Sequence, residues 1–514
     1  MPVASMWGFA LVGIEAVPVR VEAHARNGLP GVTIVGLPGA AVREARERMR
    51  SGAASSGLPL PTRRITINLS PGDVPKDGSG FDLPVALATL AACGHLPVEA
   101  VRGVGAVGEV SLEGLVRPTR GMLSVGESAG RLGVDLLITP IEGLATAAEV
   151  STVPVAGVRS LAEAVLVVRD QAIRARVVER GRRWLRTFRA PAPAAGREAL
   201  DLADVAGHQA AKRALEIVAA GGHHLLMVGS PGAGKTMLAR RLAGLLPALT
   251  REEAVDVTRI WSVAGLQGPE SGMAWERPFR APHHTASRAA LVGGGLSLRP
   301  GEVSLAHRGV LFLDELPEFS RDALEALRQP LEEGRVVISR RAGTSAFPAA
   351  FTLVAAMNPC RCGYLGHPEE RCRCPALGIE TYRARISGPL LDRIDVLIEV
   401  PPLTLAALDA EDGGESSAAV RERVEAARAF HEQRLGREPL SSPHALEDRS
   451  RMTGEARVLL RQALVREGLS GRAYVRVISL ARTIADLDNV LPVGAEHLAE
   501  ALALRLDYRR VGLA

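Results

Sequence analysis

The sequence contains very little lysine and very little cysteine. All but three of its 62 basic residues are arginine, and the exceptions are Lys76, Lys212 and Lys235. A lysine that is kept inside a motif is therefore informative, because arginine stands at almost every other basic position. Five cysteines in 514 residues are too few for a secreted scaffold built on disulfide bonds.

Other absences narrow the class of protein further. No stretch stays apolar and uncharged over the ~20 residues that a membrane-spanning helix needs. The first residues carry neither the basic nor the long apolar segment of a signal peptide. We therefore expect a cytoplasmic protein with no membrane partner. Its 47% hydrophobic content excludes intrinsic disorder, and its net charge of +5 permits a polyanionic partner without requiring one.

The hydrophobic pattern divides the chain into four parts. Residues 1–170 and 200–400 alternate strand-like apolar runs with helical patterns, which predicts a mixed α/β fold in both. Residues 171–199 combine a helical pattern with an Ala/Pro tract that cannot continue a helix, so we expect a linker there. Residues 401–514 have the periodicity of amphipathic helices and almost no strand signal.

A phosphate-binding loop is the strongest motif in the chain. It matches G-x-x-x-x-G-K-[ST] at every fixed position, through Gly229, Ser230, Pro231, Gly232, Ala233, Gly234, Lys235 and Thr236. An apolar run, Leu225–Val228, supplies the strand before it, and Met237–Leu246 has a helical pattern after it. In such loops the lysine reaches the β- and γ-phosphates and the hydroxyl ligates Mg²⁺. The motif therefore predicts ATP and Mg²⁺ as cofactors.

Two further strands end in polar residues that suit ATP hydrolysis. The apolar run Val310–Leu313 is followed by Asp314, a candidate Mg²⁺ ligand, and Glu315, a candidate general base. The run Thr352–Met357 ends at Asn358, which could orient the attacking water, although an Asn-Pro pair can also simply form a turn. An Asp-Glu pair alone is common at strand ends. Together with the phosphate loop it indicates a hydrolytic ATPase.

The order of phosphate loop, Asp-Glu strand, asparagine strand end and helical carboxyl-terminal part resembles that of an AAA+ ATPase. More narrowly, the chain is similar over nearly its whole length to the magnesium-chelatase-like YifB/ComM group. The segments that carry this resemblance, besides the ATP motifs, are Val35–Pro38, Asn68–Pro71, Pro75–Pro84, Arg280–Thr285, Arg299–Glu302, Ser387–Asp395 and Ser470–Ala473.

The resemblance implies a fold, an assembly and two more site residues. The fold is an α/β P-loop AAA+ parallel-sheet core with a helical lid, preceded by an α+β ribosomal-S5/Lon-like domain. Such proteins form homo-oligomeric rings, usually hexamers, with ATP bound between neighbours. Arg393 matches the arginine finger that is offered to the γ-phosphate of the next subunit, and Arg472 matches a second sensor that reaches ATP in its own chain.

Two segments are candidates for contact with a substrate. Pro278–Glu302, which carries the His283-His284 pair, is too long and glycine-rich for a simple crossover helix, so we expect an inserted loop with a structural or nucleotide-coupling role for the histidines. Arg335–Arg341 is predicted to form a strand that turns at Ala342-Gly343-Thr344, and hence a hairpin. Insertions at these places grip DNA in related AAA+ helicases, so Arg335, Arg340 and Arg341 are candidate phosphate contacts. A solvated charged hairpin is the alternative.

Four of the five cysteines lie close together directly after Asn358. They form a C-x-C-x₉-C-x-C pattern of Cys360, Cys362, Cys372 and Cys374. Four thiolates can close a tetrahedral Zn²⁺ site, which would be structural because no position is left open for a reactive water. The C-x-C spacing is tighter than the usual C-x₂-C, and free or redox-coupled thiols are the alternative.

The first part of the chain lacks a peptidase dyad. The stretch Pro75-Lys76-Asp77-Gly78 resembles Lon proteases, but Gly80 stands where the nucleophilic serine is expected and Ser79 is displaced by one. The helix around Met122–Arg131 has no lysine, and arginine cannot act as the base. We therefore expect this part to bind a partner or to position nucleic acid.

Three functions are consistent with these motifs and with the family resemblance. The first is an ATP-driven ring motor that acts on single-stranded or branched DNA, by branch migration or helicase action during natural transformation. The second is a chelatase-like ATPase that remodels a protein partner. The third is a Lon-like ATP-dependent protease, which the missing dyad disfavours. A response of ATP turnover to DNA would separate the first from the others.

Overall fold

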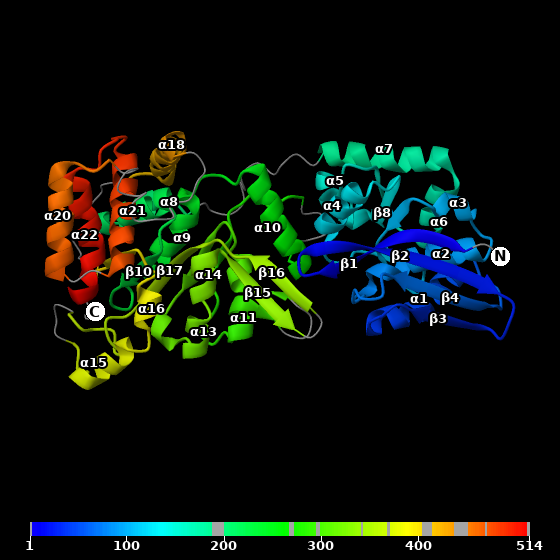
Figure 1. Cartoon of the computed structure of the whole chain (residues 1–514), viewed down its shortest axis with the longest axis horizontal. Coiled ribbons are helices and arrows are strands. Elements are labelled where there is room, and N and C mark those ends of the chain that lie inside the picture. Colours follow the sequence, from blue (N-terminus) through cyan, green and yellow to red (C-terminus); the bar gives the residue numbers. More distant parts are fainter. Residues whose placement is uncertain are drawn as a thin grey trace.

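The structure is a computed structural model of the chain, and it describes residues 3–187, 200–266, 272–294, 299–340, 343–366, 371–402, 414–435, 451–467 and 470–510. Figure 1 shows an amino-terminal sheet with its helices, a second sheet with helices on both faces, and a group of helices at the other end. The predicted Ala/Pro linker lies outside the described residues. No helix within the described ranges is both long enough and apolar enough to cross a bilayer.

The amino-terminal sheet has seven strands in the order β3-β4-β2-β1-β5-β8-β9. These strands are β1 (Ala4–Val12), β2 (Glu15–Arg26), β3 (Gly31–Val35), β4 (Arg64–Ser70), β5 (Val104–Ala106), β8 (Leu136–Pro140) and β9 (Val155–Val158). One face is covered by α1 (Ala40–Ser55), α2 (Asp82–Ala92) and α6 (Leu161–Arg169), and the other by α4 (Met122–Leu132) and α5 (Leu144–Val150). A longer helix, α7 (Gln171–Thr187), follows. Side chains along β1 point alternately to the two faces of the sheet. Met6 therefore packs in the core under α1, α2 and α6, and Phe9 packs in the core under α4 and α5.

The second sheet has five parallel strands in the order β11-β14-β17-β10-β18. They are β10 (Leu225–Val228), β11 (Phe279–Arg280), β14 (Val310–Leu313), β17 (Thr352–Met357) and β18 (Val396–Glu399). Met227 packs toward α8 (Gln209–Gly221) and α9 (Lys235–Leu245), whereas Leu226 packs toward α10 (Arg251–Ala264). Because both faces are covered, the central strands β10, β14 and β17 are buried along their whole length and almost entirely apolar, as in other parallel sheets. The predicted α/β parallel-sheet core is confirmed.

Each candidate substrate segment contains an antiparallel pair of strands outside this sheet. The first hairpin pairs β12 (Gly293–Gly294) with β13 (Arg299–Pro300), between the short helices α11 (Arg288–Val292) and α12 (Glu302–Leu305). The second pairs β15 (Arg335–Arg340) with β16 (Gly343–Pro348). The predicted hairpin is therefore present, but β16 already begins at Gly343, so Gly343 and Thr344 belong to a strand and not to the predicted turn. Arg341 lies outside the described residues.

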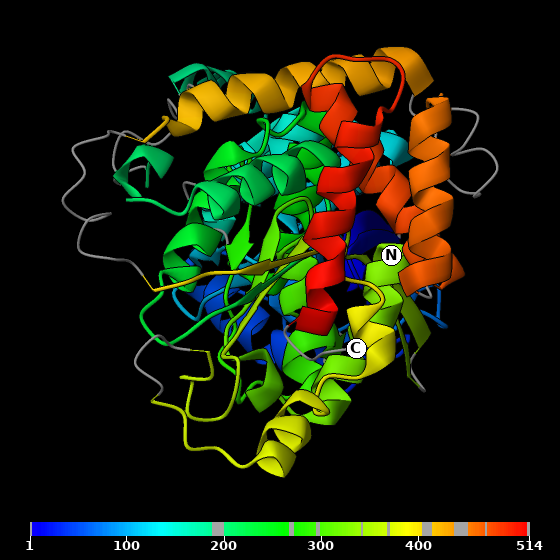
Figure 2. The ribbon, with the colours of Figure 1, turned by 90° about the vertical axis from the view of Figure 1, so that its left-hand side faces the viewer.

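Within the described residues, four helices pack on the end of the second sheet that is remote from the amino-terminal sheet (Figure 2). They are α18 (Ser417–Leu435), α20 (Gly454–Glu467), α21 (Gly471–Leu487) and α22 (Ala495–Arg510). Their apolar faces share one core with α8, α9 and the second sheet. The helices therefore form a lid that is continuous with the sheet core.

The amino-terminal part docks on α10 and on the β15–β16 hairpin. Ile14, in the turn between β1 and β2, is buried in the same core as Phe347 of β16. The Gly121 N–H donates to the Ser262 carbonyl at 3.2 Å, and Arg259 pairs with Glu127 at 2.8 Å. Apolar and charged contacts thus join the amino-terminal part to the second part of the chain through α10 and the β15–β16 hairpin.

Candidate nucleotide site

Three neighbouring strands bring the predicted ATP motifs to one edge of the second sheet. The phosphate loop follows β10, Asn358 follows β17, and Asp314-Glu315 follows β14. These strands are adjacent and parallel, so their carboxyl ends meet at the same edge, where ligands of open α/β sheets bind. The structure therefore brings together residues that lie up to about 130 positions apart in the sequence.

The phosphate loop is fixed by close backbone approach and by its lysine. A Cβ on Gly229 would lie 2.3 Å from the carbonyl oxygen of Val400, so only glycine fits there. The Lys235 ammonium donates to the carbonyls of Gly229 and Ser230, at 2.7 and 2.9 Å, and to Oδ1 of Asn358 at 3.2 Å. Burial lowers the pKa of Lys235, although nearby carboxylates act in the opposite direction. The lysine thus connects the loop with the end of β17.

Two of the predicted metal ligands are in contact. The Thr236 hydroxyl donates to Oδ2 of Asp314 at 2.8 Å. Adjacent oxygens in an octahedral Mg²⁺ shell lie about 3.0 Å apart, given Mg–O distances of ~2.1 Å. The second oxygen of Asp314 accepts the Glu315 backbone N–H at 2.9 Å, which fixes the orientation of the carboxylate. The two side chains therefore fit a Mg²⁺ ion that is bound through both oxygens.

Glu315 adopts a left-handed backbone conformation, with φ of 51°, that turns its half-exposed side chain away from the strand. His284 lies opposite, with Nδ1 3.1 Å from Oε2 of Glu315, and its ring is tilted by 33° against that of His283, with the centroids 4.1 Å apart. Sequence reasoning missed this contact. No local sequence pattern signals it, because the contact depends on β11, which precedes the histidines, being the neighbour of β14 in the sheet.

The two candidate arginines lie at the opposite edge of the sheet. Arg393 precedes β18, and Arg472 opens α21. Both pair with Glu332, and they line a cavity of about 610 Å³ together with His223, which precedes β10. Arg393 is only 4% exposed. Because a four-residue strand spans about 13 Å, this cavity is well separated from the phosphate loop of the same chain.

This arrangement differs from the prediction for Arg472. The family resemblance implied that it reaches ATP in its own chain. Its position beside Arg393 and Glu332, at the amino ends of the strands, does not support that role. The direction in which a lid helix presents its first turn depends on packing of the whole lid, and the motif Ser470–Ala473 carries no such information.

Comparisons with known proteins agree with the motifs. Residues 201–408 match the family described as magnesium chelatase, subunit ChlI, and residues 21–143 and 414–505 match two further ChlI families. The chain is 42% identical to competence protein ComM of Haemophilus influenzae over 512 residues, which cover 99% of this chain and 98% of that protein. It is 41% identical to the uncharacterized protein YifB of Salmonella typhimurium, with 96% of each covered.

The chain belongs to the magnesium-chelatase-like YifB/ComM family. It is an AAA+ ATPase of the ComM type. A shorter match, 35% identical over 154 residues, is to Lon protease of Chloroflexus aurantiacus and covers 27% of this chain and 18% of that protein. The Lon-like stretch of this ComM-type ATPase contains Lys76, which is buried and donates to the Pro71 carbonyl. Gly80, which stands where Lon proteases have their nucleophilic serine, lies close to Val107 and Thr119.

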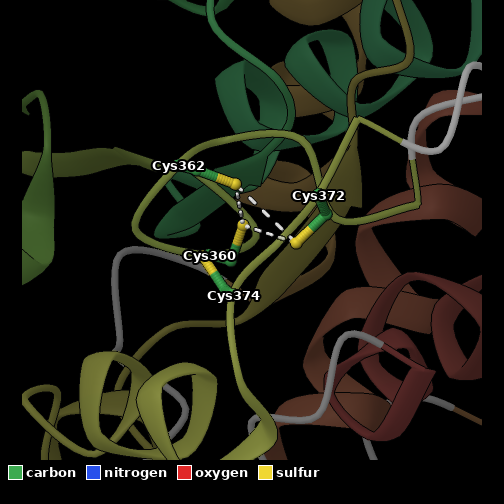
Figure 3. A group of neighbouring side chains, drawn as sticks. All are labelled: Cys360, Cys362, Cys372 and Cys374. Carbon is green, nitrogen blue, oxygen red and sulfur yellow. Dashed lines mark hydrogen bonds between the residues drawn. The ribbon is translucent and has the colours of Figure 1, made fainter.

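The remaining site predictions for this ComM-type ATPase concern DNA and metal. Arg335, at the start of β15, is exposed and lies 3.4 Å from Glu333. Arg340 ends the same strand, and its side chain is outside the described part of the chain, as is Arg341. Contact of these arginines with DNA stays a prediction. The four clustered cysteines do come together, with all four sulfurs within 4.8 Å of one another (Figure 3).

Proposed function

We propose that the protein is an ATP-hydrolysing ring motor that acts on single-stranded or branched DNA and moves branch points during natural transformation. The observation that carries the proposal is that the residues to which we assign ATP hydrolysis lie at two opposite edges of one sheet. The phosphate loop, Asp314, Glu315 and Asn358 lie at the carboxyl edge, and the paired arginines lie at the amino edge. Each chain would thus supply half of two different sites.

The residues at the carboxyl edge divide the chemistry of hydrolysis among them. Lys235 is placed to contact the β- and γ-phosphates, and Thr236 and Asp314 would hold Mg²⁺. The ion, when bound, would neutralise charge on the phosphate oxygens. Glu315 would accept the proton of the attacking water, and Asn358 would orient that water. The 3.1 Å contact with His284 would hold the Glu315 carboxylate in place before ATP binds.

The arginines would act on the site of a neighbouring copy. The distance between the two edges keeps Arg393 and Arg472 away from the phosphate loop of their own chain. We propose that both reach the γ-phosphate of the next subunit in a ring, and that the ring is a hexamer. Delocalised cations there would stabilise charge in the transition state. Glu332, which now binds both guanidinium groups, would release them when a neighbour docks.

The DNA half of the proposal has separate support. A relative that is 42% identical over nearly the whole chain is named competence protein ComM, and competence is the state in which cells take up DNA. The hairpin of β15 and β16 carries arginine at both ends of its first strand. Contacts of arginine with phosphates would be salt-dependent and largely independent of sequence.

The experiment that tests the proposal measures ATP turnover with single-stranded, duplex and branched DNA at low salt. We expect single-stranded or branched DNA to stimulate turnover and added salt to reduce the effect. The match to magnesium chelatase families favours a second candidate, a chelatase-like ATPase that remodels a protein partner. Turnover that none of the DNAs changes would reject the DNA motor and favour this candidate.

A further inference from the structure

The four-cysteine cluster is built from two short segments that face each other (Figure 3). Cys360 and Cys362 lie in the turn after Asn358, and Cys372 and Cys374 lie just before α15 (Ala376–Arg383). The Sγ atom of Cys360 is 3.3 Å from that of Cys362 and 3.7 Å from that of Cys372, and the last two are 3.7 Å apart. None of the four forms a disulfide bond.

These separations match a tetrahedral metal site. Four sulfurs at the Zn–S distance of ~2.3 Å from one centre are about 3.8 Å apart. The observed distances of 3.3–3.7 Å approach this edge length, and all four atoms lie within 4.8 Å of one another. Cys360 is fully buried, so solvent does not reach the cluster from the side of this cysteine. Four thiolates at this spacing suit a structural Zn²⁺ ion.

The same loop packs against the nucleotide site. Gly363 follows the first cysteine pair, and a Cβ at this position would lie 2.5 Å from Cδ of Pro231 in the phosphate loop. Its N–H donates to the Cys360 carbonyl at 3.0 Å, which ties the contact to a metal ligand. On the other side, the Arg383 guanidinium donates to the carbonyl of Pro359, the residue between Asn358 and Cys360. The loop is therefore fixed to the phosphate loop on one side and to α15 on the other.

We propose that the four cysteines bind one Zn²⁺ ion and that this ion holds Asn358 and the phosphate loop in their hydrolytic arrangement. The ion joins the segment after Asn358 to the segment that leads into α15. Without it, the turn that carries Gly363 loses its anchor, and the support for Pro231 is weakened. Zinc binding itself is independent of the proposed ATPase, whereas the coupling to ATP turnover rests on it.

The metal site is tested by measuring zinc in the purified full-length protein. We expect one bound ion per chain in the wild type and in Cys93→Ser, which changes the cysteine that lies outside the cluster. Cys362→Ser and Cys374→Ser should lose most of it. Wild-type protein that retains no zinc after purification with zinc present would overturn the site. If a cysteine variant fails to fold, removing zinc from folded wild-type protein with a chelator, and adding it back, provides the same comparison.

The coupling is tested with two glycines of the same loop. Gly363 and Gly366 both have positive φ, but only Gly363 contacts the phosphate loop. Gly363→Ala should keep its zinc and lose roughly tenfold to a hundredfold in turnover, as expected for misplaced catalytic groups. Gly366→Ala should keep both, which controls for backbone strain.

Reversible zinc removal should reduce turnover of the wild type by a similar factor. Equal turnover of the two glycine variants, or unchanged turnover after zinc removal, would overturn the coupling. A wild type that binds zinc but never hydrolyses ATP would instead reject the proposed function together with the coupling, and it would support the metal site alone.

Discussion

At the scale of single residues, Glu315 is the general base that we propose. It follows the strand that presents Asp314, and its side chain is turned outward and held by His284. Glu315→Gln keeps the shape but cannot accept a proton, so we expect ATP affinity to stay within a few-fold and turnover to fall by about 10²–10⁴. Fluorescent-nucleotide binding and steady-state hydrolysis measure the two effects. Turnover close to that of the wild type would remove Glu315 from this role.

His307 leads to a prediction about pH and stability. It is 4% exposed, its Nδ1 accepts the Ala350 N–H at 3.0 Å, and burial lowers its pKa to about 3. In the unfolded chain a histidine has a pKa of ~6.5, so below that pH the unfolded state binds a proton that the folded state does not. Stability therefore falls as the pH decreases from about 6.5 toward 3.

The measurement compares urea denaturation of the wild type and His307→Gln at pH 7 and pH 5. This histidine contributes up to about 1.4 kcal/mol per pH unit below 6.5. We expect the wild type to lose about 1–2 kcal/mol more than the variant between the two pH values. Equal losses in both proteins would show that His307 is not the group responsible.

At the scale of elements, the β15–β16 hairpin is the candidate DNA contact. Arg335→Ala removes one exposed cation, so we expect DNA affinity to fall by a similar factor for all sequences and the salt dependence to decrease by about one phosphate contact. Arg102→Ala is a matched control, because Arg102 is also exposed and paired with a nearby carboxylate. Fluorescence anisotropy at several salt concentrations measures both. Equal effects of the two changes would contradict a specific role of the hairpin.

Elements also show what the sequence could predict and what it could not. Strands β10, β14 and β17 are short apolar runs followed by polar residues, so their edge and its residues could be inferred from order alone. The His284–Glu315 contact depends on how an inserted loop folds back, and burial of Ile14 against Phe347 depends on docking of two bodies. Such contacts join distant segments without a local pattern. The catalytic roles themselves stay predictions.

At the scale of the whole molecule, the two edges of the second sheet would face different neighbours in the proposed ring. One edge carries a phosphate loop and the other carries Arg393 and Arg472. A head-to-tail contact that joins unlike surfaces closes into a ring when its rotation allows. The amino-terminal sheet packs on α10 and the second hairpin, so a shift of one subunit against the next would also move this body.

Mixing of variants tests the shared site and decides how Arg472 acts. Lys235→Ala should bind ATP poorly, and Arg393→Ala and Arg472→Ala should each lose most of their turnover when assembled alone. If the arginines act on the next subunit, mixing either arginine variant with Lys235→Ala creates interfaces with an intact phosphate loop and intact arginines, and turnover returns. If Arg472 acted in its own chain, its variant would stay inactive in the mixture while Arg393→Ala recovered. The double variant Lys235→Ala/Arg472→Ala is the control, because it supplies neither half, and mixing it with Arg472→Ala should restore nothing.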